Sequence, residues 1–62
     1  MKYYVWMDAE DRPLTKAWRY EDETDRMAAE RQPPSVTAVL RAGTREQLIE
    51  TFGLQEEDFA DS

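Results

Sequence analysis

The sequence predicts a small α+β domain: a three-stranded antiparallel sheet with two short helices, in the order β-β-α-β-α. Strand-like alternation of aromatic and β-branched residues near the N-terminus and after residue 34 predicts the sheet, and complete capping signals around residue 44 predict a helix. The 62 residues suffice for one domain. Cysteine and histidine are absent, so core packing or an oligomer must hold the fold.

The first strand is expected over residues 2–8, because Tyr, Val and Trp favour pleated structure. Successive side chains of a strand point to opposite faces of the sheet. Large apolar residues would therefore cover both faces, with Tyr3, Val5 and Met7 on one and Tyr4 and Trp6 on the other. This pattern predicts a central strand, or a strand with helices on one face and a partner on the other.

A turn over residues 9–13 leads into a second expected strand over residues 14–21, where Leu14, Trp18 and Tyr20 share a face. A helix stays open for this stretch, because its apolar residues also fit helical spacing. The strand is favoured, since a hairpin gives the aromatic residues cross-strand partners.

A short helix is expected from Asp22 to about Gln32. Asp22 or Thr24 can cap its free N–H groups. The two prolines at 33–34 end it, and a third strand over residues 35–41 follows.

The clearest local signal is a helix over residues 45–52. Thr44 and Gln47 match a capping box at its start, and Gly53 stands where a left-handed residue ends a helix. The simplest packing places both helices on one face of the sheet. Residues 1–54 would then form the domain, and residues 55–62 an acidic tail that frays unless Phe59 anchors it.

Several function classes are excluded or disfavoured by composition. Without cysteine and histidine, neither a Cys–His nor a Ser–His pair can form. The two glycines lie outside any phosphate-binding pattern, and the acidic runs lack the ligand spacing of a calcium loop. We therefore expect a protein that is not an enzyme and that needs no cofactor and no metal.

Residues 44–54 resemble the first helix and turn of helix-turn-helix repressors. The recognition helix that should follow reads bases with basic and polar side chains. Here residues 55–62 are acidic instead, and the chain as a whole has a net charge of −6. Phosphates would repel such a segment, so we expect no direct binding to nucleic acid.

Acidic residues gather in two stretches, which would form one face if the helices were neighbours. The aromatic residues of the hairpin are either core or anchors for a partner, because Tyr and Trp are enriched at binding hot spots. The predicted partner-binding residues are Glu21, Asp22, Glu23, Asp25, Glu46, Glu50, Glu56, Glu57, Asp58, Tyr4, Trp6, Trp18 and Tyr20.

In size and charge the chain is similar to small anti-CRISPR proteins of bacteriophages. This resemblance implies an inhibitor that occupies a basic, nucleic-acid-binding surface of a partner protein. The alternative is a structural or accessory subunit, such as a homodimer, that buries the aromatic face of its sheet. No stretch approaches the ~20 apolar residues of a membrane span, so we expect a cytoplasmic protein without a membrane partner.

Overall fold

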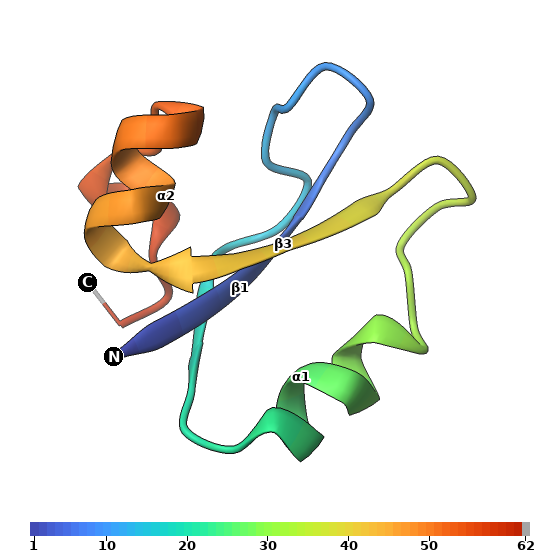
Figure 1. Cartoon of the computed structure of the whole chain (residues 1–62). Coiled ribbons are helices and arrows are strands. Elements are labelled where there is room, and N and C mark those ends of the chain that lie inside the picture. The colour runs from blue at the N-terminus through green and yellow to red at the C-terminus, as the bar shows by residue number, and fades with distance from the viewer. Residues whose placement is uncertain (62) are drawn as a thin grey trace.

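The computed structural model describes residues 1–61, and within them the elements follow the predicted order (Figure 1). Three antiparallel strands form one sheet: β1 (Lys2–Met7), β2 (Trp18–Tyr20) and β3 (Val39–Thr44). The helical elements are α1 (Glu23–Glu30), α2 (Arg45–Phe52) and a short 3₁₀ helix, η1 (Glu56–Asp58). The predicted α+β class and the order β-β-α-β-α are confirmed.

The sheet has the strand order β2-β1-β3, so β1 is its central strand. β1 pairs with β3 along its whole length, from Lys2 opposite Thr44 to Met7 opposite Val39. Its pairing with β2 covers only the stretch from Lys2 to Tyr4. The apolar residues on both faces of β1 predicted either a central strand or a strand with helices on one face and a partner on the other. The structure shows the first of these, a central strand.

The third strand lies further along the chain than predicted, over residues 39–44 rather than 35–41. The register with β1 explains the shift, because this position pairs all six residues of β1. Residues 35–38 instead turn the chain back from α1 towards the sheet, with the N–H of Ala38 donating to the carbonyl of Ser35 (3.3 Å). Val36 is fully exposed in this turn.

The second strand is confirmed as a strand but is shorter than the predicted 14–21. The N–H of Leu14 donates to the carbonyl of Trp6 (2.8 Å), as in a hairpin. The N–H of Trp6, however, donates to the side-chain hydroxyl of Thr15 (3.3 Å). A side chain thus replaces the carbonyl that a regular ladder would supply, and strand pairing resumes only at Trp18.

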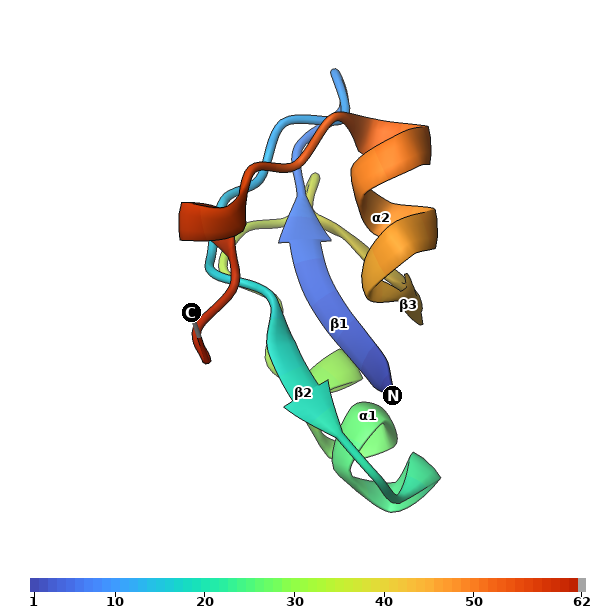
Figure 2. The same ribbon diagram turned by 90° about the vertical axis from the view of Figure 1, so that its left-hand side faces the viewer.

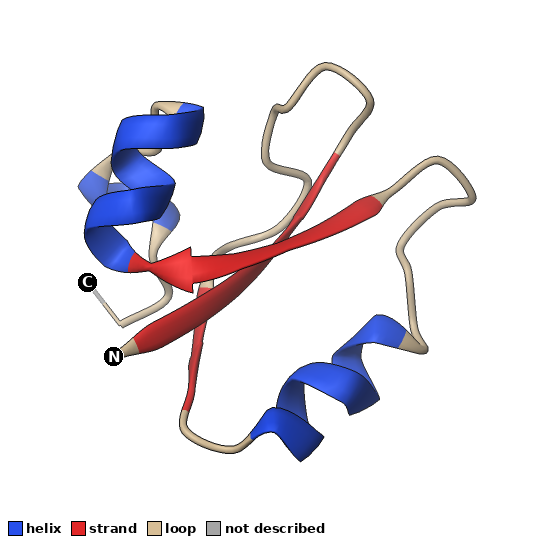
Figure 3. Ribbon diagram, in the orientation of Figure 1, coloured by secondary structure: helices blue, strands red, loops and turns tan. Residues whose placement is uncertain are grey.

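Asp8 organises the turn at the start of the loop that joins β1 to β2 (Figure 3). Its carboxylate accepts hydrogen bonds from the backbone N–H groups of Glu10 (2.8 Å) and Arg12 (2.9 Å). These donors, that of Arg12 above all, lower the pKa of Asp8. Asp11 has a φ of 60°, a left-handed conformation that Asp tolerates better than most residues.

The two helices lie on opposite faces of the sheet, so the prediction that they share one face is wrong (Figures 1 and 2). On one face, Val5 of β1 packs in the same cluster as Leu48 of α2. On the other face, Tyr4 of β1 lines a hollow with Ala28 and Ala29 of α1. Because β1 is apolar on both faces, each face needs a helix of its own.

The main core lies between β1, α2 and the C-terminal segment. Its buried residues are Tyr3, Val5, Met7, Ala17, Leu48, Leu54 and Phe59, with Ile49 and Phe52 packed against them. Phe59 is 1% exposed and meets the ring of Tyr3 edge-on, with the centroids 5.1 Å apart. The segment predicted as a tail, 55–62, is therefore anchored through Phe59 over residues 55–61; residue 62 lies outside the described residues.

The capping of α2 is as predicted. The hydroxyl of Thr44 accepts the N–H of Gln47 (3.2 Å), and the Gln47 side chain accepts the N–H of Thr44 (2.9 Å). Gly53 has a φ of 69° and donates its N–H to the carbonyl of Ile49 (2.9 Å). A Cβ atom at Gly43 would lie 2.9 Å from the Gln47 side-chain oxygen, so the absence of a side chain there makes room for the capping box.

α1 is the more exposed of the two α-helices. Asp22 caps it by accepting the N–H of Thr24 (3.0 Å), one of the two predicted capping residues. The helix ends at Glu30, two residues before the predicted end at Gln32, and it has no fully buried residue. Arg26 and Ala29 are its partly buried residues.

Replacing Phe59 tests whether the C-terminal segment is part of the domain. We expect Phe59→Ala to destabilise by about 3–5 kcal/mol, which is most of the stability of a domain this small. Leu14→Ala, at a half-exposed apolar residue, is the control and should cost much less. Urea unfolding followed by circular dichroism measures both, and equal losses would mean that residues 55–61 fray.

Thr44→Ala removes one half of the α2 capping box. We expect a loss of about 1 kcal/mol in the free energy of unfolding, the usual cost of losing an N-cap side chain. Thr51→Ala, at an exposed position of the same helix, should change that free energy by less than about 0.5 kcal/mol. If the two variants unfold at the same urea concentration, the capping box does not stabilise α2.

Candidate functional site

The first acidic stretch is exposed but largely engaged in local structure. It contains Glu21, Asp22, Glu23 and Asp25, all of them exposed. Asp22 caps α1, and the N–H of Thr24 lowers its pKa. Glu23 forms an ion pair with Arg26 (2.6 Å), which also pairs with Glu30 (3.2 Å). Within residues 1–61, Asp25 forms no recorded ion pair, so it is the freest carboxylate of this stretch.

The second acidic stretch contains a pair of like charges on α2. Glu46 and Glu50 are both exposed and are four residues apart, so they are neighbours on the helix surface. No ion pair is recorded for either among the described residues. Like charges at this spacing destabilise a helix by about 0.2–0.5 kcal/mol. Glu46 lies in the first turn of α2, where a carboxylate favours the helix dipole, whereas Glu50 lies in the last turn, where it does not.

The remaining acidic residues of this stretch lie in η1. Asp58 accepts the backbone N–H of Gln55 (2.7 Å), so its carboxylate caps the turn. Glu56 forms an ion pair with Arg45. Glu57 is exposed, and in the described part of the chain its side chain has no recorded partner. Of the three, Glu57 is the one whose carboxylate remains available to a partner.

Arg45 is a structural residue that sequence reasoning missed. Its guanidinium lies over the ring of Phe59, 4.3 Å from the centroid. It donates to the hydroxyl of Tyr3 (3.2 Å), to Asp61 (3.2 Å) and to Glu56. Glu56 above all raises the pKa of Arg45. This cluster ties the C-terminal segment to β1. Its only signal in the sequence was that Arg45 is a single basic residue beside a long acidic stretch.

The aromatic face is mostly core. Trp6 is 8% exposed and Tyr20 is 7% exposed, so neither offers a surface to a partner. Tyr4 is half-buried and packs against Tyr20 with the ring centroids 5.8 Å apart. Trp18, which is 50% exposed, is the one member of the predicted aromatic set with a large free surface. The others were expected as either core or anchors; Trp6 and Tyr20 are buried, and Tyr4 is half-buried beside them.

The two acidic stretches do not meet on one face. The first lies at α1 and the second at α2 and η1, and the sheet separates the two α-helices (Figure 1). The two stretches therefore form separate acidic surfaces. The second stretch has the higher unbalanced charge, because residues 46–61 contain acidic residues but no basic one.

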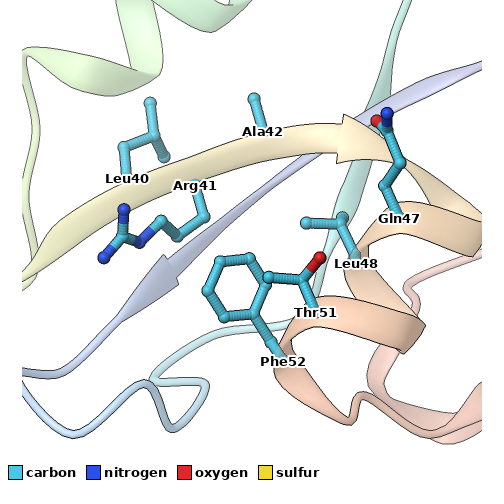
Figure 4. A pocket seen from close by; sticks show the side chains of 7 residues that line it. All are labelled: Leu40, Arg41, Ala42, Gln47, Leu48, Thr51 and Phe52. Atoms are coloured by element: carbon cyan, nitrogen blue, oxygen red, sulfur yellow. The ribbon is translucent and has the colours of Figure 1, made fainter.

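A groove runs beside the outer edge of β3, where α2 lies along the strand (Figure 4). Its volume is about 450 Å³, and its lining residues are Leu40, Arg41, Ala42, Gln47, Leu48, Thr51 and Phe52. Arg41 lies over the Phe52 ring, 5.5 Å from the centroid. Its Nε is buried and lacks a hydrogen-bond partner within the described residues. Sequence reasoning missed the groove because it placed the third strand too early.

The groove has no evident catalytic chemistry. Arg41 is the one ionisable residue in its lining, so no pair of carboxylates is available there for acid–base work. Among residues 1–61, no group of three or more potential metal ligands lies close enough to hold an ion. In the same part of the chain, no helix has the length and apolar character to cross a bilayer.

Comparisons of the chain with protein-family models, with curated proteins and with solved structures give no match. The interpretation of these surfaces therefore depends on their own geometry and charge.

The Asp61 carboxylate gives the C-terminal cluster a measurable acid sensitivity. The hydroxyl of Tyr3, which donates to it at 2.8 Å, and then Arg45 hold the pKa of Asp61 below its ordinary value. A carboxyl group whose pKa is lower in the folded than in the unfolded chain stabilises the fold above about pH 4, and this stabilisation is lost as the pH falls through the folded pKa.

We expect Asp61→Asn to lower the free energy of unfolding at pH 6, and the difference from the unmodified protein to shrink as the pH falls to 2. Urea unfolding at several pH values measures it. Asp8 and Asp22 keep their own acid sensitivity in both proteins, so the difference isolates Asp61. Asp25→Asn, at an exposed carboxylate with no recorded ion pair in the described chain, is the matched control. A difference that stays constant with pH would show that the Asp61 carboxylate does not stabilise the fold.

Proposed function

We propose that the protein is a non-catalytic acidic binding protein that occupies a basic surface of a partner protein. The like-charge pair of Glu46 and Glu50 on α2 carries this proposal. Like charges at this spacing repel one another, and Glu50 lies in the last turn of α2, where the helix dipole disfavours a carboxylate, so a positively charged partner would relieve both effects. Asp25 and Glu57 add exposed carboxylates that form no recorded ion pair within the described chain.

The basic residues strengthen this imbalance, because most of them are engaged within the chain. The arginines that pair with carboxylates are Arg12, Arg19, Arg26, Arg41 and Arg45. The unpaired carboxylates thus face solvent with few free cations beside them. Such a field attracts a basic partner and speeds the encounter.

The partner class proposed is a protein with a nucleic-acid-binding channel or groove. Such channels are lined by Lys and Arg that neutralise phosphates. Exposed carboxylates on a rigid helix would take the place of phosphates there and keep the nucleic acid out. This is the anti-CRISPR-like mode of inhibition, and the cytoplasm is the compartment proposed for it.

The alternative is a structural or accessory subunit that forms a homodimer through its aromatic face. One observation favours it, the half-exposed Trp18 in the edge strand β2. Trp6 and Tyr20 are already buried within one chain, so little of the aromatic face is left for a second copy. We therefore prefer the acidic binding protein.

Salt dependence and charge removal test the proposal. The partner is captured from a lysate of the native source and purified, and its dissociation constant is measured at 50 and 300 mM NaCl. We expect weaker binding at the higher salt, and about tenfold weaker binding for Glu46→Gln/Glu50→Gln/Glu57→Gln, since three exposed charge contacts of about 0.2–1 kcal/mol each are lost. Short nucleic acid should compete with the protein for the same partner.

The matched control removes the same charge elsewhere: Glu10→Gln/Glu21→Gln/Glu30→Gln, at three exposed carboxylates away from α2 and η1. It should bind within about twofold of the unmodified protein. An affinity that does not change with salt, or a partner that binds the protein and nucleic acid together, would refute the proposal.

A further inference from the structure

Residues 22–38 form one continuous segment that covers a face of the sheet between the end of β2 and the start of β3 (Figures 1 and 2). This covering segment consists of α1 and of the irregular stretch that follows it. Tyr4, Trp6 and Tyr20 lie on the face beneath it, because each of them lines a hollow together with residues of the segment. The segment is thus the cover of the aromatic face.

No polar bond joins the covering segment to the rest of the described chain. Asp22 caps α1, which belongs to the same segment. Arg26 forms ion pairs with Glu23 (2.6 Å) and Glu30 (3.2 Å), both on its own helix. The backbone bonds in the turns before and after α1 also have both partners within the segment. Packing contacts therefore hold the segment on the sheet.

These packing contacts are thin. α1 has no fully buried residue, and Arg26 and Ala29 are its partly buried ones. The largest aliphatic side chains of the segment contribute little, since Met27 is 47% exposed and Val36 is fully exposed. Hollows of about 330, 360 and 570 Å³ lie along the contact with the sheet. A helix of eight residues is marginal in water unless tertiary packing supports it.

The other half of the domain is held by contacts that do not involve the covering segment. Leu48 of α2 and Phe59 of the C-terminal segment are each 1% exposed. Ala17 exchanges backbone hydrogen bonds with the C-terminal segment, and Arg45 donates to the hydroxyl of Tyr3. Removal of the covering segment from the sheet would leave all of these contacts in place.

Each end of the covering segment can act as a hinge. At its start, the chain bends at Glu21 and Asp22 between β2 and α1. At its end, residues 31–38 have no regular structure, and Ala38 is the one residue among them that is not exposed. A few loop residues of this kind can absorb the change in backbone angles that a rigid-body opening requires.

We infer that residues 22–38 form a hinged lid, which opens as a unit from the face of Tyr4, Trp6 and Tyr20 while β1, β3, α2 and the C-terminal segment stay folded. Opening of the least packed segment costs less than unfolding of the whole domain. The closed lid buries these aromatic residues, and the open lid exposes them, so the lid controls access to this face. The lid does not rest on the proposed function, because the carboxylates of α2 and η1 lie outside it.

Amide hydrogen exchange by NMR, in the absence of urea and at several urea concentrations below the unfolding transition, tests whether the lid opens by itself. Unfolding of the domain exposes much surface and depends steeply on urea, whereas lid opening exposes little. We expect the amides of residues 27–30 in α1 to be protected at least tenfold less than those of residues 49–52 in α2. Their exchange should also depend less than half as steeply on urea. Equal protection with equal urea dependence would overturn the lid.

Ala28→Pro breaks α1 from within and tests whether the remaining domain stands without it. Ala28 is exposed, so the change acts on the helix backbone rather than on the core. In a Trp18→Phe background, Trp6 is the one remaining tryptophan. We expect acrylamide to quench its fluorescence at least threefold more strongly, while the amides of α2 stay protected. Ala28→Ser in the same background preserves the helix and is the matched control, with quenching unchanged.

Three results with these variants would overturn the lid. Loss of amide protection throughout α2 in Ala28→Pro would show that the domain cannot stand without the closed segment. Unchanged quenching of Trp6 would show that α1 does not control access to the aromatic face. An equal gain of quenching in Ala28→Ser would separate the exposure of Trp6 from the loss of the helix. None of these results bears on salt-dependent binding to a basic partner, so the lid and the proposed function fail separately.

Discussion

The fold depends on a single constraint, which is that β1 is apolar on both faces. Tyr3, Val5 and Met7 face α2 and the C-terminal segment, whereas Tyr4 and Trp6 face α1. A chain of this size buries only ~60% of its unfolded surface, so it can leave neither face open. Each helix is therefore committed to one face. Most of the aromatic residues that the sequence offers as candidates for a binding surface are therefore buried beneath the helices.

Once both faces are covered, the edges and the charges become the parts of the molecule that are free to act. The C-terminal segment pairs with Ala17, the residue before β2, and Arg45 holds that segment by stacking on Phe59 and donating a hydrogen bond to Tyr3. Within residues 1–61, no segment pairs with the outer edge of β3. Its side of the sheet also carries α2, whose solvent face has Glu46 and Glu50. The open edge and the unbalanced charge thus lie on neighbouring elements.

Sequence reasoning succeeded where the signals are local and failed where distant residues decide. The α2 helix was predicted to the residue, because Thr44, Gln47 and Gly53 determine its ends within one short segment. The position of β3 depends on its register with β1, and no residue within the strand encodes that register. The contact between Tyr3 and Asp61 joins residues 58 positions apart, so neither it nor the groove had a local signature.

Long-range charge and close contact would contribute different terms to an association. Exposed carboxylates act over a Debye length of about 8 Å and mainly raise the rate of encounter. Contacts at close range act only after encounter, and they lower the rate of dissociation because several must break together. Charge alone would bind many basic surfaces weakly. Selectivity would have to come from the shape of the surface around the charge, which a partner must match at close range.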